Sequence, residues 1–209
     1  IGGVVSITTK DPDEDLGGSA FAEYGSFNTF RGGASVGNAN DTGDFRLAIV
    51  GTSSDGISKA DENDNNTEDD AYEALPLSAK GGLNLGSDAQ LSANVLWTDV
   101  EAEFDGFGPV DADQTSETEE VSANISLTGS LFDERLENLL VVGYADIDRQ
   151  NFTNGSPSFD ATGDRILYRY QGTLGINDAN KLAFGVERVD TTSVDVDTAI
   201  DGLFALFEW

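Results

Sequence analysis

A two-residue alternation of apolar and polar side chains constrains the fold of this chain more than any other sequence feature. It recurs in segments of about ten residues, for example at 90–99, 120–131, 165–176 and 181–188, and it is typical of β-strands that bury one face. Helical periodicity is nearly absent. The pattern predicts an all-β fold, an antiparallel up-and-down meander of about ten strands.

The apolar members of this alternation are expected to share one side of a single sheet. They are Leu91, Val95, Trp97, Val121, Ile125, Leu127, Leu140, Val142, Tyr144, Ile166, Tyr168, Tyr170, Leu182, Phe184 and Val186. Several of the aromatic residues lie near the ends of their predicted strands. The polar residues between them are expected on the opposite side.

The predicted connections alternate in length. Short links rich in Gly, Asn and Asp are expected at 38–43, 86–88, 132–137 and 177–180. Long loops are expected at 55–70, 104–117, 150–163 and 190–201. Short turns at one end and long loops at the other are typical of outer-membrane barrels. The alternative is a soluble β-sandwich whose aromatic residues fill a core.

Charge and composition exclude several classes of function. The chain has 39 Asp and Glu against 11 Lys and Arg, a net charge of −28, so nucleic-acid binding is not expected. It has no His and no Cys, which removes His-dependent triads, cysteine nucleophiles and imidazole or thiolate metal sites. No enzymatic activity is therefore expected, an outer-membrane hydrolase included. Any bound metal must take oxygen ligands.

The first residues differ from the rest of the chain. Ile1-Gly2-Gly3-Val4-Val5-Ser6-Ile7-Thr8-Thr9-Lys10 is an apolar strand that opens with paired glycines, and the polar Asp11-Pro12-Asp13-Glu14-Asp15 follows it. This stretch resembles the end of the plug domain of TonB-dependent outer-membrane receptors, and the strand order that follows resembles their cobalamin-receptor branch. The resemblance implies a plug end at 1–10, a linker at 11–16 and an incomplete transmembrane β-barrel at 17–209.

The resemblance also implies a function and a location. Such a receptor resides in the bacterial outer membrane, contacts its lipid, and actively takes up a scarce large solute such as a corrinoid or an iron chelate (siderophore). Energy reaches it from the TonB complex through a plug that lies upstream of Ile1. The alternative from a different class is a calcium-dependent binding or adhesion module built as an acidic β-sandwich.

The number of strands bears on whether the barrel is complete. The family barrel has 22 strands around a plug, and about ten are predicted here. An open meander in lipid leaves unpaired backbone groups that cost several kcal/mol each, so the chain is expected to be a piece of a barrel. Phe207 and Trp209 imitate the terminal aromatic residue of complete barrels, which keeps a self-contained ten-stranded barrel as the alternative.

Two acidic loops are candidates for calcium binding. Asp61, Asn63 and Asn65 match the start of an EF-hand loop, but Asn66 and Tyr72 stand at its glycine and glutamate positions, so an EF-hand is rejected. Glu68-Asp69-Asp70-Ala71-Tyr72 resembles an acidic run of the cobalamin receptors. The candidate Ca²⁺ ligands are Asp61, Asn63, Glu68 and Asp70 from the first loop and Asp105 and Asp113 from the second. The alternative is that these loops are only solvated acidic tips.

The polar faces of the predicted strands carry basic residues. These are Arg31, Arg46, Lys80, Arg165 and Arg169. In a barrel they point into the lumen, where they are expected to pair with acidic groups of the plug or the wall.

Overall fold

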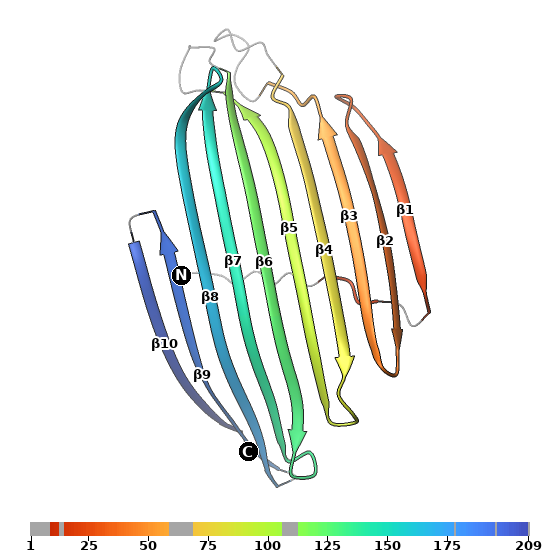
Figure 1. Cartoon of the computed structure of the whole chain (residues 1–209), viewed down its shortest axis with the longest axis vertical. Coiled ribbons are helices and arrows are strands. Elements are labelled where there is room, and N and C mark those ends of the chain that lie inside the picture. Colours follow the sequence, from red (N-terminus) through yellow and green to blue (C-terminus); the bar gives the residue numbers. More distant parts are fainter. Residues whose placement is uncertain are drawn as a thin grey trace.

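The fold is given by a computed structural model, which describes residues 9–12, 15–58, 69–105, 113–177, 179–194 and 196–208. Ten strands make up nearly all of these residues (Figure 1). Their bounds are β1 Gly17–Tyr24, β2 Phe30–Asn40, β3 Gly43–Ser54, β4 Tyr72–Asn84, β5 Ala89–Phe104, β6 Gln114–Leu131, β7 Leu136–Thr153, β8 Ser156–Asn177, β9 Asn180–Ser193 and β10 Val196–Glu208.

The ten strands form one antiparallel sheet in which each strand pairs with its sequence neighbours, in the order β1 to β10. The all-β meander predicted from the sequence is confirmed. Among the described residues, no helix is long and apolar enough to cross a membrane.

The sheet is a single layer with almost no protein core. The chain exposes 14129 Å², against about 9,300 Å² expected for a compact monomer of its mass. Within the described residues, Val189 is the one buried hydrophobic side chain. A sandwich packs two sheets about 10 Å apart around interdigitating side chains, and here the apolar face meets no second sheet. The sandwich alternative is therefore wrong.

The sheet is also open. Over the described residues, β1 pairs with β2 alone and β10 with β9 alone, so the two edge strands do not close on each other. A closed ten-stranded barrel is therefore contradicted. Both edges present backbone N–H and C=O groups that further strands can pair with.

The short connections appear where the sequence predicts them, at 41–42, 85–88, 132–135 and 178–179. Two predicted long loops are wrong. The segments 150–163 and 190–201 are largely strand: β7 ends at Thr153 and β8 begins at Ser156, while β9 ends at Ser193 and β10 begins at Val196. Asn154 and Gly155 have φ of 49° and 71°, and positive φ at both central residues is the signature of a type I′ hairpin turn, which favours Asn-Gly. The two longer connections are 55–71 and 105–113.

The start of the described chain lies against the sheet. The Lys80 ammonium on β4 forms an ion pair with the Asp11 carboxylate, and Asp11 precedes β1. Residues 1–8, which the sequence predicts to be a plug remnant, lie outside the described residues, as do 13 and 14. The boundaries at 1–10, 11–16 and 17–209 stay predictions.

Candidate functional site

One face of the sheet, called the outer face here, carries rows of large apolar side chains. Side chains of directly paired residues point to the same side of a sheet, so the strand register assigns every residue to a face. One row contains Leu83, Leu91, Leu127, Leu140, Tyr170, Val186 and Leu203. The fifteen apolar residues predicted to share a face all do so. Ile125 is 57% and Leu140 47% exposed, so the described protein does not cover them.

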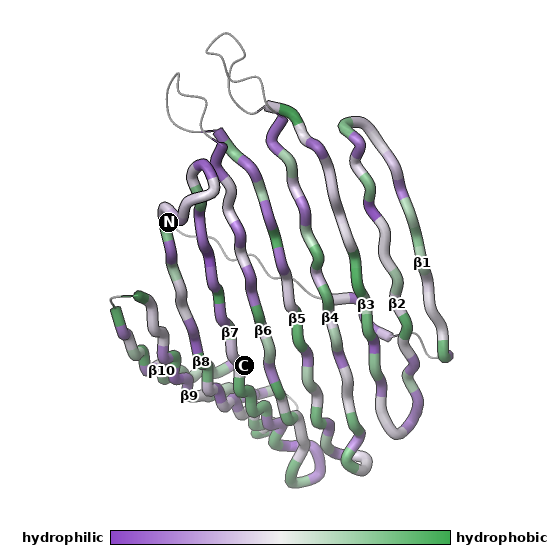
Figure 2. Tube along the Cα trace, turned by 45° about the horizontal axis from the view of Figure 1, so that its top comes forward, coloured by the Kyte–Doolittle hydropathy of each residue, from purple (hydrophilic) through white to green (hydrophobic). Residues whose placement is uncertain are grey.

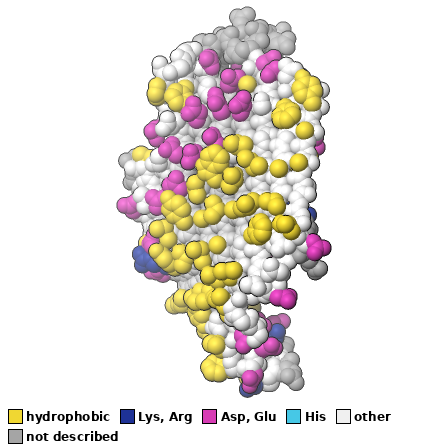
Figure 3. Space-filling view, turned by 45° about the vertical axis from the view of Figure 1, so that its right-hand side comes forward, with side chains coloured by type: hydrophobic (Ala, Val, Ile, Leu, Met, Phe, Trp, Pro, Cys, Tyr) yellow, Lys and Arg dark blue, Asp and Glu magenta, His cyan; other side chains and the backbone are white. Residues whose placement is uncertain are grey.

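Hydrophobic residues alternate with polar ones along the strands in Figure 2, and on the outer face their side chains form a broad band, yellow in Figure 3. Soluble monomers rarely expose an apolar patch larger than a few hundred Å². A patch that extends across most of the sheet is typical of a surface that contacts lipid or another protein.

Acidic side chains follow directly above this band, toward the end of the sheet that carries the longer connections (Figure 3). On each of β4 to β10, an outward-facing acid comes within the next two outward positions above the band, although Phe152 faces outward still higher on β7. These seven residues, called the acidic row, are Glu73, Asp99, Glu119, Asp146, Asp164, Asp190 and Asp201. On β9, Arg188 stands between the band and Asp190 and forms an ion pair with it at 2.8 Å.

The upper edge of the band crosses the strands at an angle. It is formed by Leu75, Trp97, Val121, Tyr144, Ile166, Val186 and Leu203 on β4 to β10. Leu75 on β4 pairs with Asp99 on β5. Leu203 on β10 lies in the same row as Leu91, which is eight residues below Asp99 on β5. Over six strand spacings this descent corresponds to an angle of about 40°. Strands of transmembrane barrels tilt by about 35–45°.

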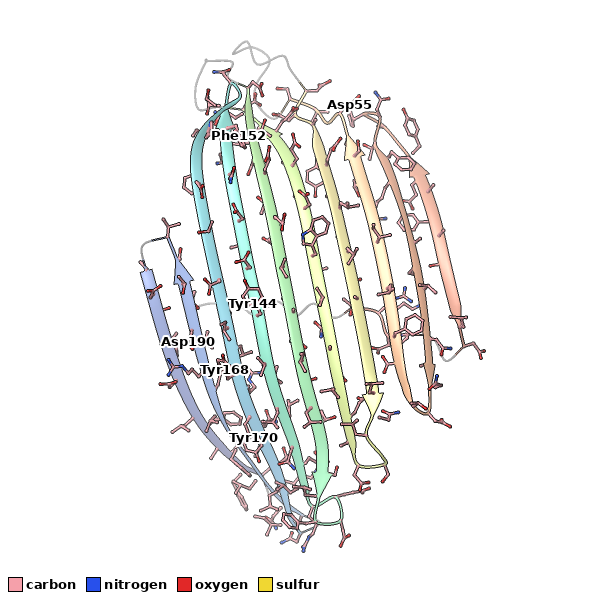
Figure 4. All side chains as sticks on the ribbon, in the orientation of Figure 1. Asp55, Tyr144, Phe152, Tyr168, Tyr170 and Asp190 are labelled. Carbon is pink, nitrogen blue, oxygen red and sulfur yellow. The ribbon has the colours of Figure 1, made fainter. Side chains whose placement is uncertain are left out.

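The height of the band agrees with the same geometry. On β6 it runs from Val121 to Leu131, ten residues apart. That span is about 33 Å along the strand, or about 25 Å along the normal at this tilt, which is the height of the apolar belt of outer-membrane barrels. Trp97 and Tyr144 lie at the upper edge, where aromatic side chains are enriched in membrane proteins. Figure 4 shows Tyr144, Tyr168 and Tyr170 at successive levels of β7 and β8.

The opposite, inner face is mixed, because polar side chains there alternate in level with apolar ones such as Leu96, Leu167 and Phe204. Asn94 and Asn124 exchange two side-chain hydrogen bonds at 2.9 and 3.0 Å. The five basic residues predicted to leave the apolar side are all on this face. Arg31 lies 3.5 Å from Glu23, and the Arg169 Nε–H donates to Glu187 at 2.6 Å.

The candidate calcium ligands fall at the ends of neighbouring strands. Asp70 lies two residues before β4 and is 3% exposed, Asp105 directly follows β5 and is partly buried, and Asp113 directly precedes β6 and is exposed. The register of β4 with β5 and of β5 with β6 brings these three backbone positions to one edge of the sheet. Asp61, Asn63 and Glu68 lie outside the described residues.

Backbone contacts organise this edge. The Ala71 N–H donates to the Glu103 carboxylate at 2.9 Å, and the Glu103 N–H donates to the Ala71 carbonyl at 2.9 Å. Gly56 has φ of 73°, and a Cβ there would meet the Asp70 carbonyl oxygen at 1.9 Å. In the part of the chain that the structure describes, no three acidic residues are grouped to hold a metal ion. Calcium binding stays a prediction.

The sequence argument missed Glu103 and the acidic row. A signal for the row was present, because Asp99, Glu119 and Asp146 continue the two-residue alternation beyond Trp97, Val121 and Tyr144. Extending each apolar series by one outward position finds all three acids.

Comparisons with known proteins give a result at the level of structure only. No family model and no curated protein sequence matches the chain. Among solved structures, the copper transporter OprC matches with TM-score 0.60 and 20% identity over 92% of this chain and 32% of its own. The ferric preacinetobactin receptor BauA of Acinetobacter baumannii matches with TM-score 0.59 and 10% identity over 85% of this chain and 36% of its own. The siderophore receptor PiuA of the same organism matches with TM-score 0.58 and 10% identity over 95% of this chain and 40% of its own.

These structures are TonB-dependent outer-membrane receptors. The chain has the fold of part of such a receptor barrel. It spans about a third to two fifths of the length of these proteins. The comparisons support the receptor fold, and they give no support to the cobalamin branch that the opening motif resembles.

Proposed function

We propose that the chain is part of a TonB-dependent receptor of the bacterial outer membrane that takes up an iron chelate. The relatives in fold are receptors for ferric preacinetobactin and for a siderophore, together with a copper transporter, which favours a metal-carrying solute. Neither they nor the structure favours a corrinoid.

In this proposal the two faces have separate tasks. The outer face contacts lipid tails below the acidic row, and the inner face lines the passage for the solute. The open edges at β1 and β10 pair with the remaining strands of the barrel, because an unpaired edge in lipid costs several kcal/mol per backbone group. Energy comes from the TonB complex through a plug upstream of β1. No residue of the chain performs covalent chemistry.

The observation that carries the proposal is the slanted upper edge of the apolar band. An exposed apolar face alone is also expected of a protein that docks onto another protein. An apolar band inclined by about 40° to the strands and about 25 Å high has the two dimensions that a barrel wall in a bilayer requires. A docking surface on a soluble sheet has no reason to have both.

The test uses the complete protein in its own cells. We expect it in the outer-membrane fraction, soluble only in detergent, and we expect iron-starved cells to take up radiolabelled ferric chelates through it. Deleting the protein or TonB should abolish this uptake equally. Release of the protein into buffer without detergent contradicts the membrane assignment. Uptake that survives loss of TonB contradicts the receptor mechanism.

A further inference from the structure

The two faces of the sheet differ in how many basic residues they carry. Eight described basic residues lie in strands, and Arg188 alone is on the outer face. The other seven are Arg31, Arg46, Lys80, Arg149, Arg165, Arg169 and Lys181. In a chain with 39 acidic and 11 basic residues, chance placement would not keep the cations on one face. The outer face has the acidic row and a single cation, whereas the inner face has seven cations together with acids such as Glu23, Glu120 and Glu187.

Three of these arginines descend along the inner face of β7 and β8. The register places Arg149 in the row of Val100, Arg165 opposite Ala145 in the row of Leu96, and Arg169 opposite Val141 in the row of Ser92. Each arginine is four residues below the one before it, or about 13 Å along the strands. We call these three residues the arginine track. It starts near the end that carries the longer connections and reaches the level of the apolar band.

The upper two members of the arginine track have no carboxylate partner among the described residues. The Arg149 Nε–H donates to the Ser116 hydroxyl at 3.1 Å and to the Asn151 amide oxygen at 3.3 Å, both neutral acceptors. Arg165 is exposed and has no described hydrogen bond or ion pair. Arg169 is paired with Glu187. The track therefore presents two available guanidinium groups followed by a neutralised one.

One carboxylate faces the same side between the two upper arginines. Glu120 on β6 pairs with Ile147, in the row between Arg149 and Arg165. It is exposed, and no described ion pair joins it to either arginine. Glu120 is thus placed to compete with any anion that approaches the two guanidinium groups.

We propose that the arginine track binds an anionic solute, a ferric chelate that carries carboxylate groups, as it passes along the inner wall. This inference rests on the proposed function and adds the charge of the solute. Guanidinium groups bind carboxylates through two parallel hydrogen bonds and do not lose their charge. Two such groups about 13 Å apart hold the chelate successively. The pairing of Arg169 with Glu187 ends the track, so an anion is not retained at depth.

The test compares two ferric chelates of different charge in the complete receptor, ferric citrate as the anionic member and ferrichrome as the uncharged one. Wild-type receptor should bind and take up the anionic chelate in preference, and this preference should fall with rising salt. Arg149→Gln together with Arg165→Gln should reduce binding of the anionic chelate about tenfold and leave the uncharged one unchanged. Glu120→Gln should strengthen binding of the anionic chelate about two- to threefold. The matched control is Arg188→Gln, the same change on the outer face, which should alter neither.

Each outcome has a distinct meaning. A preference for the uncharged chelate, or a preference for the anionic one that survives the double variant, overturns the arginine track while the receptor function stands. If the double variant instead lowers unfolding stability and weakens both chelates equally, the arginines pair with acids of the plug, and the inference is overturned. Uptake of neither chelate by wild-type receptor overturns the inference together with the proposed function.

Discussion

The lower and upper parts of the same sheet follow different rules. Below the acidic row, large apolar residues occupy every strand of β4 to β10 on the outer face, which in the proposed receptor contacts lipid. Above it, the strands continue for several residues in which charged and polar side chains predominate, as on β7 from Asp146 to Thr153, where Ile147 and Phe152 are the two apolar residues. Hydrogen bonds between strands hold both parts equally. The difference shows that strands form with or without the two-residue alternation of apolar and polar residues. The alternation therefore indicates the environment of a strand, and its absence does not indicate a loop.

The largest effect is expected from a charge placed in the lower part. Leu140→Arg puts a guanidinium at the middle of the apolar band on β7, and it should lower the free energy of unfolding in lipid by about 2 to 4 kcal/mol. Asp148→Arg, on the same strand and face but above the band, should cost less than about 1 kcal/mol. Urea titration of the complete receptor in lipid vesicles measures both. Equal costs would remove the distinction between the two parts.

A smaller effect is expected at the turn that ends the upper part. Gly155 has φ of 71°, and Gly155→Ala should destabilise the β7–β8 hairpin by about 1 to 2 kcal/mol because a Cβ disfavours the left-handed region. Gly25→Ala is the control, since that glycine also has open space around it and no positive φ. Hydrogen exchange at the upper ends of β7 and β8 should increase in the first variant only. Increased exchange in both variants would argue against the turn geometry.

Calcium should order the upper edge if the acidic loops bind it. Calorimetry of the complete receptor should show binding with a Kd of about 10⁻⁴ to 10⁻³ M. Asp70→Asn with Asp105→Asn should weaken it about tenfold, or about 1.4 kcal/mol, whereas Asp41→Asn with Asp88→Asn at the opposite end should not. Absence of binding heat in the wild type would leave these loops as solvated acidic tips.

The smallest effect concerns the contact between the linker and the inner wall. The hydrogen bond and charge of Lys80 hold the pKa of the Asp11 carboxyl below its ordinary value of 3.8. A lowered pKa means that the ion pair stabilises the folded protein above pH 3.8 and loses this effect as the pH falls through the lowered value. Titrating the Asp11 carboxyl by NMR should show its pKa rising toward 3.8 in Lys80→Gln. An unchanged pKa would contradict the contact. Lys181→Gln, at the far end of the inner face, serves as control.

The sequence predicts the lower part of the sheet well and the upper part poorly, for the same reason. Val121, Ile125 and Leu127 can be assigned to one face because they belong to an unbroken two-residue alternation of apolar and polar positions. Residues 150–163 are predicted as a loop because they lack that alternation, although Asn154-Gly155 is a strong hairpin signal. The slant of the band depends on the register of six strand pairs, and alternation within one strand does not specify it.

The candidate loop site is predicted less completely. The sequence identifies Asp70 and Asp105 as candidates, and the register brings their backbones to one edge. The sequence gives no indication that Asp70 is buried. The backbone of Gly56, fourteen residues earlier in the chain, closely approaches the backbone of Asp70, and this contact cannot be predicted from the local pattern. Glu103 escapes notice because nothing in the local pattern separates it from the many other acids.

The central claim is that the apolar band faces lipid with the strands tilted by about 40°, and site-directed spin labelling tests it most directly. This chain contains no cysteine, so nitroxides can be attached at Trp97→Cys, Leu91→Cys and Leu203→Cys in the complete receptor in lipid. Accessibility to oxygen and to a polar nickel chelate gives the depth of each label. We expect the labels at positions 97 and 203 to lie at nearly equal depth near the outer interface. The label at position 91 should lie about 15 Å deeper, although residue 91 is in the same row of the sheet as residue 203. Equal depth for 91 and 203, or access of the nickel chelate to all three labels, would contradict it.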